Sequence, residues 1–403
     1  MTLSKQPSHA IKTWRICVLF LPDLTAEVAS TATLHVGNTL RLLEPLASEI
    51  FIITGNFPED AISNDKVHLI NIRIKAEDNT RSSMLLRVPK FLMLQLRMSL
   101  QVIRLAKRFE VLFLAAGAQV LFLPALVAKL LRKKIALIHL GVGASSRQDY
   151  EVMFEKTLFG AGRRLFPWLT ELMERVSFRL ADRIMVFLSH SDSPLLRKYT
   201  DKTYFGCSRF YVDIKAMKVE RSLASREKLV GYIGRFIDMK GVMNFVKAIP
   251  LIISTSAETK VLIGGDGPQR QEIEQEIKDA GLENRVTLTG WIPHNNLSRY
   301  LNKMKLLVIP SYGEHGPHMV IEAMACGTPV LATSVGIVPD VIKDGETGFI
   351  LENNSPESIA KDVIKALENQ KLEEISRKAR KLVEEEYTFE LAVEKYREVL
   401  ESL

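Results

Sequence analysis

The sequence predicts an α/β protein with two doubly wound domains. The chain has 403 residues, which is enough for two domains of ordinary size with a core each. Short, nearly uninterrupted apolar stretches alternate with helical patterns, as expected of parallel sheets that are covered on both faces. This alternation occurs twice, with about six strands in each half, so each half is expected to form its own sheet.

The strands expected in the first half are residues 15–21, 49–55, 67–72, 111–116, 135–141 and 183–189. Those in the second half are 228–235, 260–267, 285–291, 306–312, 328–334 and 348–352. Helical periodicity fills the intervals between them. The polar stretch 214–228 predicts a linker, and the charged segment from Lys371 onward predicts helices without a strand. We therefore expect one domain over 1–213, a second over 229–385 and a terminal helix over 386–403.

Composition indicates a globular protein of a reducing compartment. Hydrophobic residues make up 47% of the chain and charged residues 25%. Cys17, Cys207 and Cys326 lie far apart without a CxxC pair, so neither a disulfide framework nor a zinc site is expected. The first twelve residues, MTLSKQPSHAIK, lack the apolar core of a signal peptide. The sequence predicts a cytoplasmic protein, either free or bound to the inner face of the membrane.

One apolar stretch resembles a membrane span without predicting one. Residues 111–128 contain no charge over 18 positions, the lower limit for crossing a bilayer. However, Gly117, Gln119 and Pro124 divide the stretch into a buried strand and the start of a helix. The alternating pattern of the rest of the chain favours this interpretation.

Positive charge is concentrated in the first half. Residues 1–220 have a balance of +11 and the remainder one of −4. Residues 81–109 contain seven basic side chains and no acid, and Lys90, Arg97 and Arg104 fall at heptad spacing with Leu and Met opposite. A basic amphipathic helix of this kind suits an anionic membrane surface. It equally suits a helix that packs on the sheet with a solvated edge, whereas no recognition module for nucleic acid is present.

The stretch EHGPHMVIEAMACGTPV (314–330) follows a predicted buried strand. Glu314 lies in the loop at the carboxyl end of that strand, where ligands of open α/β sheets bind. Pro317 suits the first turn of a helix that Gly327 ends, and Glu322 is expected to face the same edge. The free N–H groups at residues 316–318 can hold a phosphate. An acid beside an anion site indicates an anion that carries hydroxyl groups, such as a sugar joined to a diphosphate.

Two further strand ends in the same half carry related features. GYIGRFIDMKG (231–241) places Arg235 and Lys240 before a helix start, and both cations can bind phosphate oxygens. GGDGPQ (264–269) supplies a turn with Gly265 and Gly267, where a backbone can approach a ligand closely. Three such strand ends together predict a site for a nucleotide-linked sugar.

Residues 230–367 resemble the retaining glycosyltransferases of family four, the group 1 glycosyl transferases. The motifs occur in the family's order as GR-x4-KG, GDGP, PS-x2-E-x7-E-A-M-A-x-G-x-P-V and D-G-x-T-G-F. The first half is less similar and offers IALIHLG with His139, the stretch ADRIMVFLS, and RFYVD. The resemblance implies the glycosyltransferase-B fold, with two Rossmann-like domains facing across a cleft that holds the donor. It also implies that helix 386–403 crosses back to the first domain.

The resemblance also implies roles for matching residues. Arg235 and Lys240 would bind the donor diphosphate, Glu322 the ribose hydroxyls and Glu314 the transferred sugar, which His139 would face. Glu314, His139, Arg235 and Lys240 would therefore be the catalytic residues. Neither a metal nor a cofactor is implied, because the nucleotide-diphosphate sugar is a co-substrate and no suitable DxD is present. The implied donor contacts are Arg235, Lys240, Gly265, Gly267, Glu314, Gly316, Pro317, His318, Met319 and Glu322.

The sequence departs from the family in one loop that matters for the acceptor. The usual Gly-Gly pair after the first strand is replaced by residues 22–40, which contain only Gly37. The function expected is metal-independent, retaining sugar transfer to a glycan or lipid-linked acceptor of the cell envelope. A catalytically weak nucleotide-sugar-binding scaffold and a UDP-sugar 2-epimerase remain alternatives. The presence of Arg235, Lys240, Glu314 and Glu322 together favours the enzyme, since a scaffold has no physical need for all four.

Overall fold

The protein divides into two compact units. Unit 1 comprises Met1–Arg209 and Val393–Leu403, and unit 2 comprises Phe210–Ala392. Each unit is described by itself. The computed structural model describes residues 12–20, 29–55, 57, 64–72, 84–115, 118–139, 166–186, 196–207, 210–313, 318–336 and 338–403, without the side chains of 29–35, 84–88, 90 and 166–170.

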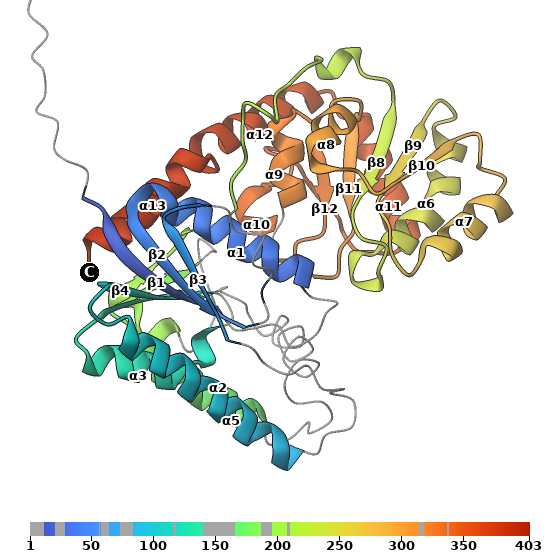
Figure 1. Cartoon of the computed structure of the whole chain (residues 1–403). Coiled ribbons are helices and arrows are strands. Elements are labelled where there is room, and N and C mark those ends of the chain that lie inside the picture. The colour runs from blue at the N-terminus through green and yellow to red at the C-terminus, as the bar shows by residue number, and fades with distance from the viewer. Residues whose placement is uncertain are drawn as a thin grey trace, which may run out of the picture. The chain divides into compact units, whose positions relative to one another are not determined.

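Unit 1 contains a seven-stranded sheet in the order β3-β2-β1-β4-β5-β6-β7 (Figure 1). All neighbouring strands are parallel. The order reverses between β1 and β4, as in a doubly wound sheet. The strands are β1 (Trp14–Leu19), β2 (Ala47–Thr54), β3 (Val67–Asn71), β4 (Val111–Leu114), β5 (Lys134–His139), β6 (Arg183–Val186) and β7 (Thr203–Tyr204).

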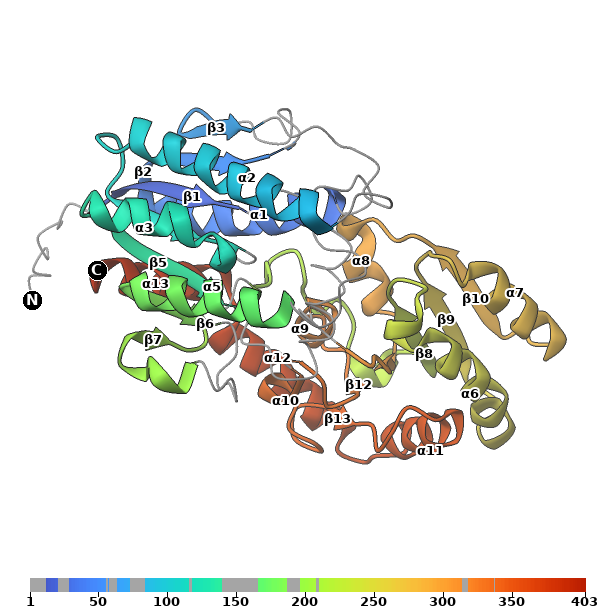
Figure 2. The same cartoon turned by 90° about the horizontal axis from the view of Figure 1, so that it is seen from below.

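Helices cover both faces of this sheet (Figure 2). One face carries α2 (Met84–Arg104), α3 (Phe122–Leu130) and α5 (Phe166–Leu180), and α3 packs against both of the others. The core between these helices and the sheet contains the strand residues Cys17, Leu112 and Leu114. Along each strand they alternate with residues that face the other side of the sheet. The other face carries α1 (Ala29–Leu43) and α13 (Phe389–Glu401), where Tyr396 stacks on Phe113.

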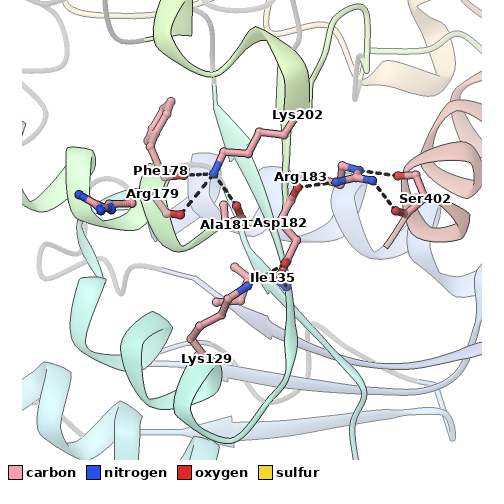
Figure 3. A network of polar contacts seen from close by, with 9 residues as sticks. All are labelled: Lys129, Ile135, Phe178, Arg179, Ala181, Asp182, Arg183, Lys202 and Ser402. Carbon is pink, nitrogen blue, oxygen red and sulfur yellow. Dashed lines mark hydrogen bonds and ion pairs between the residues drawn. The ribbon is translucent and has the colours of Figure 1, made fainter.

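Polar contacts fasten the ends of these helices to the sheet (Figure 3). Lys202 Nζ donates to the carbonyl oxygens of Phe178 (2.7 Å) and Ala181 (2.6 Å) at the C-terminal end of α5. Asp182 accepts from Lys129 of α3 at 2.7 Å and from the backbone N–H of Ile135 at 2.9 Å. Lys202 thereby pairs carbonyl groups that the C-terminal end of α5 leaves without partners, and Asp182 joins α3 to β5. They fix α3 and α5 on the sheet.

The end of the chain is attached to the same sheet. Helix α13 begins in unit 2, and its residues from Val393 onward belong to unit 1. Arg183 of β6 donates to Ser402 Oγ at 2.9 Å and to the Ser402 carbonyl oxygen at 2.6 Å. The guanidinium thereby supplies a partner to the Ser402 carbonyl group at the end of α13.

Helix α2 has two apolar faces. Phe91, Leu94, Met98, Val102 and Leu105 are buried in the core of unit 1, as the sheet-packing interpretation of residues 81–109 predicts. A second set of large apolar side chains on the same helix is exposed: Leu92, Met93, Leu96, Leu100 and Ile103. Sheet packing therefore accounts for only one of the two faces.

Unit 2 contains a six-stranded parallel sheet in the order β10-β9-β8-β11-β12-β13. Its order reverses between β8 and β11. The strands are β8 (Leu229–Ile233), β9 (Lys260–Gly264), β10 (Val286–Gly290), β11 (Leu306–Ile309), β12 (Val330–Ala332) and β13 (Phe349–Ile350). The two sheets share one topology except for the additional β7 at the edge of unit 1.

The helices of unit 2 also lie in two layers. One core cluster joins the sheet to α6 (Val242–Thr255), α7 (Arg270–Asp279) and α11 (Pro356–Leu367). A second group of packed helices comprises α8 (His294–Leu301), α9 (His318–Ala325) and α12 (Leu372–Glu386). The short α10 (Val338–Val341) follows β12.

The polar segment 214–228, predicted as a linker, is part of unit 2. Arg226 is buried, and its guanidinium donates to Thr328 Oγ1 and to the carbonyl oxygen of Cys326, both at 2.8 Å. It also donates to the carbonyl oxygen of Met304 at 3.1 Å. Burial lowers the pKa of Arg226 to about 10. The segment is thus fastened to the domain by a buried cation, which its polar composition does not indicate.

The predicted fold class is confirmed. A strand is present at each of the twelve places expected from the sequence, and the two sheets are doubly wound and parallel. The two-residue β7 is too short to leave a pattern in the sequence. In the part of the chain that the structure describes, no helix is long and apolar enough to cross a membrane.

Candidate functional site

The point where the strand order of unit 2 reverses lies between β8 and β11. Loops that follow neighbouring strands diverge at such a point, and ligands of doubly wound sheets bind there. The loop after β8 carries the predicted cations, and the loop after β11 leads into α9. These two loops are therefore the first place to look for a ligand site.

The loop after β8 packs directly on the segment after β11. Gly241 has φ +64°, and a Cβ at this position would lie 2.0 Å from the carbonyl oxygen of Pro310. The Tyr312 N–H donates to the carbonyl oxygen of Met239 at 2.9 Å. Only glycine fits both the left-handed backbone and the close approach. These contacts hold the loop after β8 against the loop after β11.

A side-chain contact adds to this arrangement. Asn244, in the first turn of α6, donates through Nδ2 to Tyr312 Oη and to the carbonyl oxygen of Asn354, both at 2.7 Å. The start of α6 is thereby held beside the loop after β11. Its first-turn N–H groups and the positive end of its dipole form a favourable environment for an anion.

The predicted cations lie at this helix start. Lys240 is half-buried immediately before Gly241, which caps α6, and Arg235 is exposed two residues after β8. Two cations beside a helix N-terminus can bind an anion with more than one charge. The arrangement is therefore suited to a diphosphate.

The glycine-rich turn after β9 packs against the same loop. Gly265 has φ +139°, and a Cβ there would lie 1.9 Å from the carbonyl oxygen of Gly234. At Gly267, with φ +153°, a Cβ would lie 2.6 Å from the carbonyl oxygen of Phe236. The Phe236 N–H donates to the carbonyl oxygen of Asp266 at 2.8 Å. The glycines therefore allow the two loops to approach each other, and the contacts fix the backbone on both sides of Arg235.

Glu322 lies inside α9 and is buried. Its Oε1 is 2.6 Å from Nε2 of His294, the first residue of α8. The His294 side chain is largely exposed, whereas that of Glu322 is only 9% exposed. A carboxylate that is held in this way can accept further hydrogen bonds from hydroxyl groups through its other oxygen. His294 was not among the residues expected from the sequence.

The N-terminal end of α9 begins at His318. The His318 ring packs edge-on against Phe210, with 4.7 Å between ring centroids, and Met319 is half-buried in the same turn. Glu314, Gly316 and Pro317, which were predicted to bind the donor, lie outside the described residues.

His139 ends strand β5 of unit 1. Its side chain is 7% exposed and packs edge-on against Phe178, with 5.1 Å between ring centroids. Neither ring nitrogen has a hydrogen-bond partner among the described residues. Burial lowers the pKa of His139 to about 4, so the imidazole is neutral at pH 7. A buried polar group without a partner requires an explanation, and a ligand is one.

Among the predicted residues, the structure brings one set together at the reversal point of unit 2. The Arg235–Lys240 loop contacts the turn of Gly265 and Gly267, and it also contacts the loop that leads toward α9. Within the described residues, no group of three His, Cys, Asp or Glu side chains has the arrangement of a metal site. Sequence reasoning missed Asn244, Tyr312 and His294, because their partners lie 28 to 110 residues away along the chain.

A known family model matches most of unit 2. Residues 213–382 match the family model of glycosyl transferases group 1. The matched range contains the cation loop, the glycine-rich turn and α9.

Curated relatives align with part of the chain. N-acetyl-alpha-D-glucosaminyl L-malate synthase of Bacillus anthracis is 32% identical over 188 residues, which are 46% of this chain and 49% of that protein. Poly(ribitol-phosphate) alpha-N-acetylglucosaminyltransferase of Staphylococcus aureus is 30% identical over 172 residues, 42% of this chain and 34% of that protein. The chain thus spans about half the length, or less, of these curated relatives.

Solved structures match nearly the whole chain. The Anabaena Alr3699/HepE structure in complex with UDP has a TM-score of 0.71 at 16% identity, covering 96% of this chain and 100% of that one. Sucrose-phosphate synthase from Thermosynechococcus elongatus has a TM-score of 0.65 at 20% identity, covering 96% and 99%. The protein has the glycosyltransferase-B fold with two Rossmann-like domains.

Proposed function

We propose that the protein is a retaining, metal-independent glycosyltransferase of family four that takes its sugar from a nucleotide-diphosphate donor. The observation that supports this most directly is the packing at the reversal point of unit 2. There the loop that carries Arg235 and Lys240 contacts both the Gly265–Gly267 turn and the segment leading toward α9. Fixed cations and a helix N-terminus at one position provide the electrostatic environment that a departing diphosphate requires.

Each predicted residue has a role in this proposal. Arg235, Lys240 and the N-terminus of α6 hold the diphosphate, and Glu322 accepts hydrogen bonds from the ribose hydroxyls. Glu314 contacts the transferred sugar, and so does His139, whose neutral imidazole can accept a hydrogen bond without adding charge. Backbone groups of Gly265, Gly267, Gly316, Pro317, His318 and Met319 complete the donor contacts.

The proposed reaction keeps the configuration of the anomeric carbon. The bond from this carbon to the donor phosphate oxygen breaks, and the acceptor hydroxyl oxygen forms a new bond on the same face. The hydroxyl proton passes to the departing phosphate oxygen. Arg235 and Lys240 stabilise the charge that develops on the diphosphate, which lowers the barrier because these charges are already in place.

The names of the relatives suggest which donor to test first. Two of them are named for transfer or incorporation of N-acetylglucosamine, and a solved structure of this fold contains UDP. We therefore propose UDP-N-acetylglucosamine as the donor, and a glycan or lipid-linked molecule of the cell envelope as the acceptor. The reaction would take place in the cytoplasm or on the inner face of the membrane.

Calorimetric titration with UDP-N-acetylglucosamine tests the donor site. Lys240→Ala and Arg235→Ala should each raise the dissociation constant by about 10- to 100-fold, because a charge-assisted hydrogen bond contributes ~1.5–3 kcal/mol. Lys247→Ala is the matched control, since this exposed lysine lies farther along α6. Two variants that bind as tightly as the parent would contradict the phosphate role.

Product analysis then separates the transferase from its alternatives. Incubation with donor and a panel of acceptors should release UDP and give a glycoside with the donor's anomeric configuration. Formation of a 2-epimer without an acceptor would instead identify an epimerase. Tight binding with no turnover on any acceptor would favour the scaffold.

A further inference from the structure

Exposed apolar side chains of unit 1 are concentrated on three neighbouring helices. The described residues contain fifteen large hydrophobic side chains that are exposed, and nine of these lie on α2, α3, α5 or the residue after α3. The nine are Leu92, Met93, Leu96, Leu100, Ile103, Leu126, Leu130, Leu131 and Leu172. We call them the three-helix surface. These helices form a single layer over one face of the sheet (Figure 2).

The exposed residues of α2 lie opposite its buried ones. At about 100° per residue, Leu96 and Leu100 project roughly 180° away from Met98, which is fully buried. Leu100 is 54% exposed and Leu130, on α3, is 76% exposed. Isolated surface leucines need no explanation, but nine exposed apolar side chains on three helices that pack side by side indicate an interaction surface.

Cations border this surface. Arg97 and Arg104 are exposed along one edge of α2, and Arg132 and Lys134 are exposed just after α3. Residues 81–109 contain no acid. Of the acids on α5, Glu171 pairs with Arg175 at 2.7 Å. The surface is therefore apolar at its centre and positive at its border.

The surface is also held in a fixed shape. The Lys129–Asp182 pair fastens α3, and the contacts of Lys202 with carbonyl groups fasten the end of α5 (Figure 3). A ligand therefore meets a preformed layer and pays little ordering entropy.

We propose that the three-helix surface binds an anionic lipid bilayer, with its leucines inserted at the headgroup boundary and its arginines on acidic headgroups. A helix with apolar residues on its outer face and cations at the border lies in the plane of such an interface. A second copy of the chain fits less well, since a twofold contact would bring Arg97 and Arg104 against an equally positive border. Membrane binding itself does not depend on the proposed function. Its use for the protein does rest on that function, because a lipid-linked acceptor would lie in the membrane.

Vesicle flotation of the full chain measures this binding. The parent should float with phosphatidylglycerol-containing vesicles, bind pure phosphatidylcholine weakly, and be released as salt is raised. Replacing both arginines, Arg97→Ala with Arg104→Ala, should lower the partition coefficient about 30-fold on anionic vesicles, from ~1 kcal/mol per cation. The pair Leu96→Gln and Leu100→Gln should lower it roughly tenfold or more, and glutamine preserves the helix.

Matched controls come from unit 2. Arg377→Ala with Lys381→Ala removes the same charge from the exposed side of α12, and Leu251→Gln changes an exposed leucine of α6. These variants should bind vesicles like the parent. A parent that does not float with anionic vesicles at low salt overturns the proposal. Control variants that lose as much binding as the surface variants overturn it as well.

Two further measurements complete the test. Sedimentation that shows a dimer which the Leu96 and Leu100 changes dissociate would assign the surface to a second copy instead. UDP-N-acetylglucosamine titration of the same variants should give the parent's affinity. Normal nucleotide binding without flotation defeats only the membrane proposal, whereas flotation without nucleotide binding defeats only the proposed function.

Discussion

Replacing the buried imidazole of His139 should change how the stability of unit 1 depends on pH. Burial lowers the pKa of His139 to about 4, from 6.5 for an ordinary histidine. The unfolded chain therefore takes up a proton on this side chain below pH 6.5, while the folded chain remains neutral until about pH 4. The free energy of unfolding of unit 1 should therefore be at its full value above pH 6.5, and it should fall as the pH decreases from 6.5 to about 4.

The two pKa values set the size of the effect. At pH 7.5 neither state is protonated and the contribution is close to zero. At pH 5 protonation of His139 in the unfolded chain lowers the parent's free energy of unfolding by about 2 kcal/mol. Below pH 4 this loss levels off at ~3 kcal/mol. His139→Leu removes the titrating group while it keeps a side chain of similar size. The variant should therefore lack this part of the pH dependence.

Hydrogen–deuterium exchange of peptides from β4, β5 and β6 gives the opening free energy of unit 1 separately from that of unit 2. We expect the parent curve to fall more steeply than that of His139→Leu between pH 7 and 5, with a difference of about 2 kcal/mol at pH 5. The other histidines are present in both proteins, so their contributions cancel in the comparison. Parallel curves would refute the reasoning, because they would mean that the folded protein does not lower the pKa of His139.

Two further predictions concern unit 2, and a third concerns the reaction. Gly265→Ala should destabilise it by about 1–3 kcal/mol more than Gly281→Ala does, as measured by exchange of its peptides, since both glycines have positive φ but only Gly265 would clash with a backbone oxygen. Equal losses would mean that the loops can separate at little cost. His294→Ala should weaken nucleotide binding roughly fivefold to tenfold in calorimetry, and His294→Gln, which can still donate to Glu322, should restore most of it. Sugar transfer should persist in excess chelator; loss that magnesium or manganese reverses would contradict metal independence.

The fold could be predicted because both sheets leave strong local patterns. Each predicted strand is a short apolar run at the expected place, and the carboxyl ends of parallel strands necessarily lie at one edge of a sheet. That rule alone predicts that Arg235, Lys240 and the Gly265 turn lie at the same edge of the sheet in unit 2. The strand order, which places β8 beside β11, then determined which two loops meet.

Contacts between distant segments could not be predicted in the same way. The composition of 214–228 is polar, yet Arg226 is buried because carbonyl groups near residues 304 and 326 surround its guanidinium. The pairing of His294 with Glu322 depends on how α8 and α9 pack. Neither contact has a signal in the local sequence, since the residues that each contact joins are 28 to 100 positions apart along the chain.

Helix α2 shows where a periodic pattern reaches its limit. The pattern of 81–109 indicated an amphipathic helix with cations on one stripe, but leucine and methionine occupy most of the remaining circumference. Hydrophobic periodicity alone cannot tell which of these side chains a neighbouring helix will cover. The packing of α3 and the sheet covers Leu94 and Met98 and leaves Leu96 and Leu100 exposed. The net charge of the first half thus acquires a location only when the apolar residues beside it are known, and this combination of exposed cations and exposed leucines is the basis of the membrane-binding proposal.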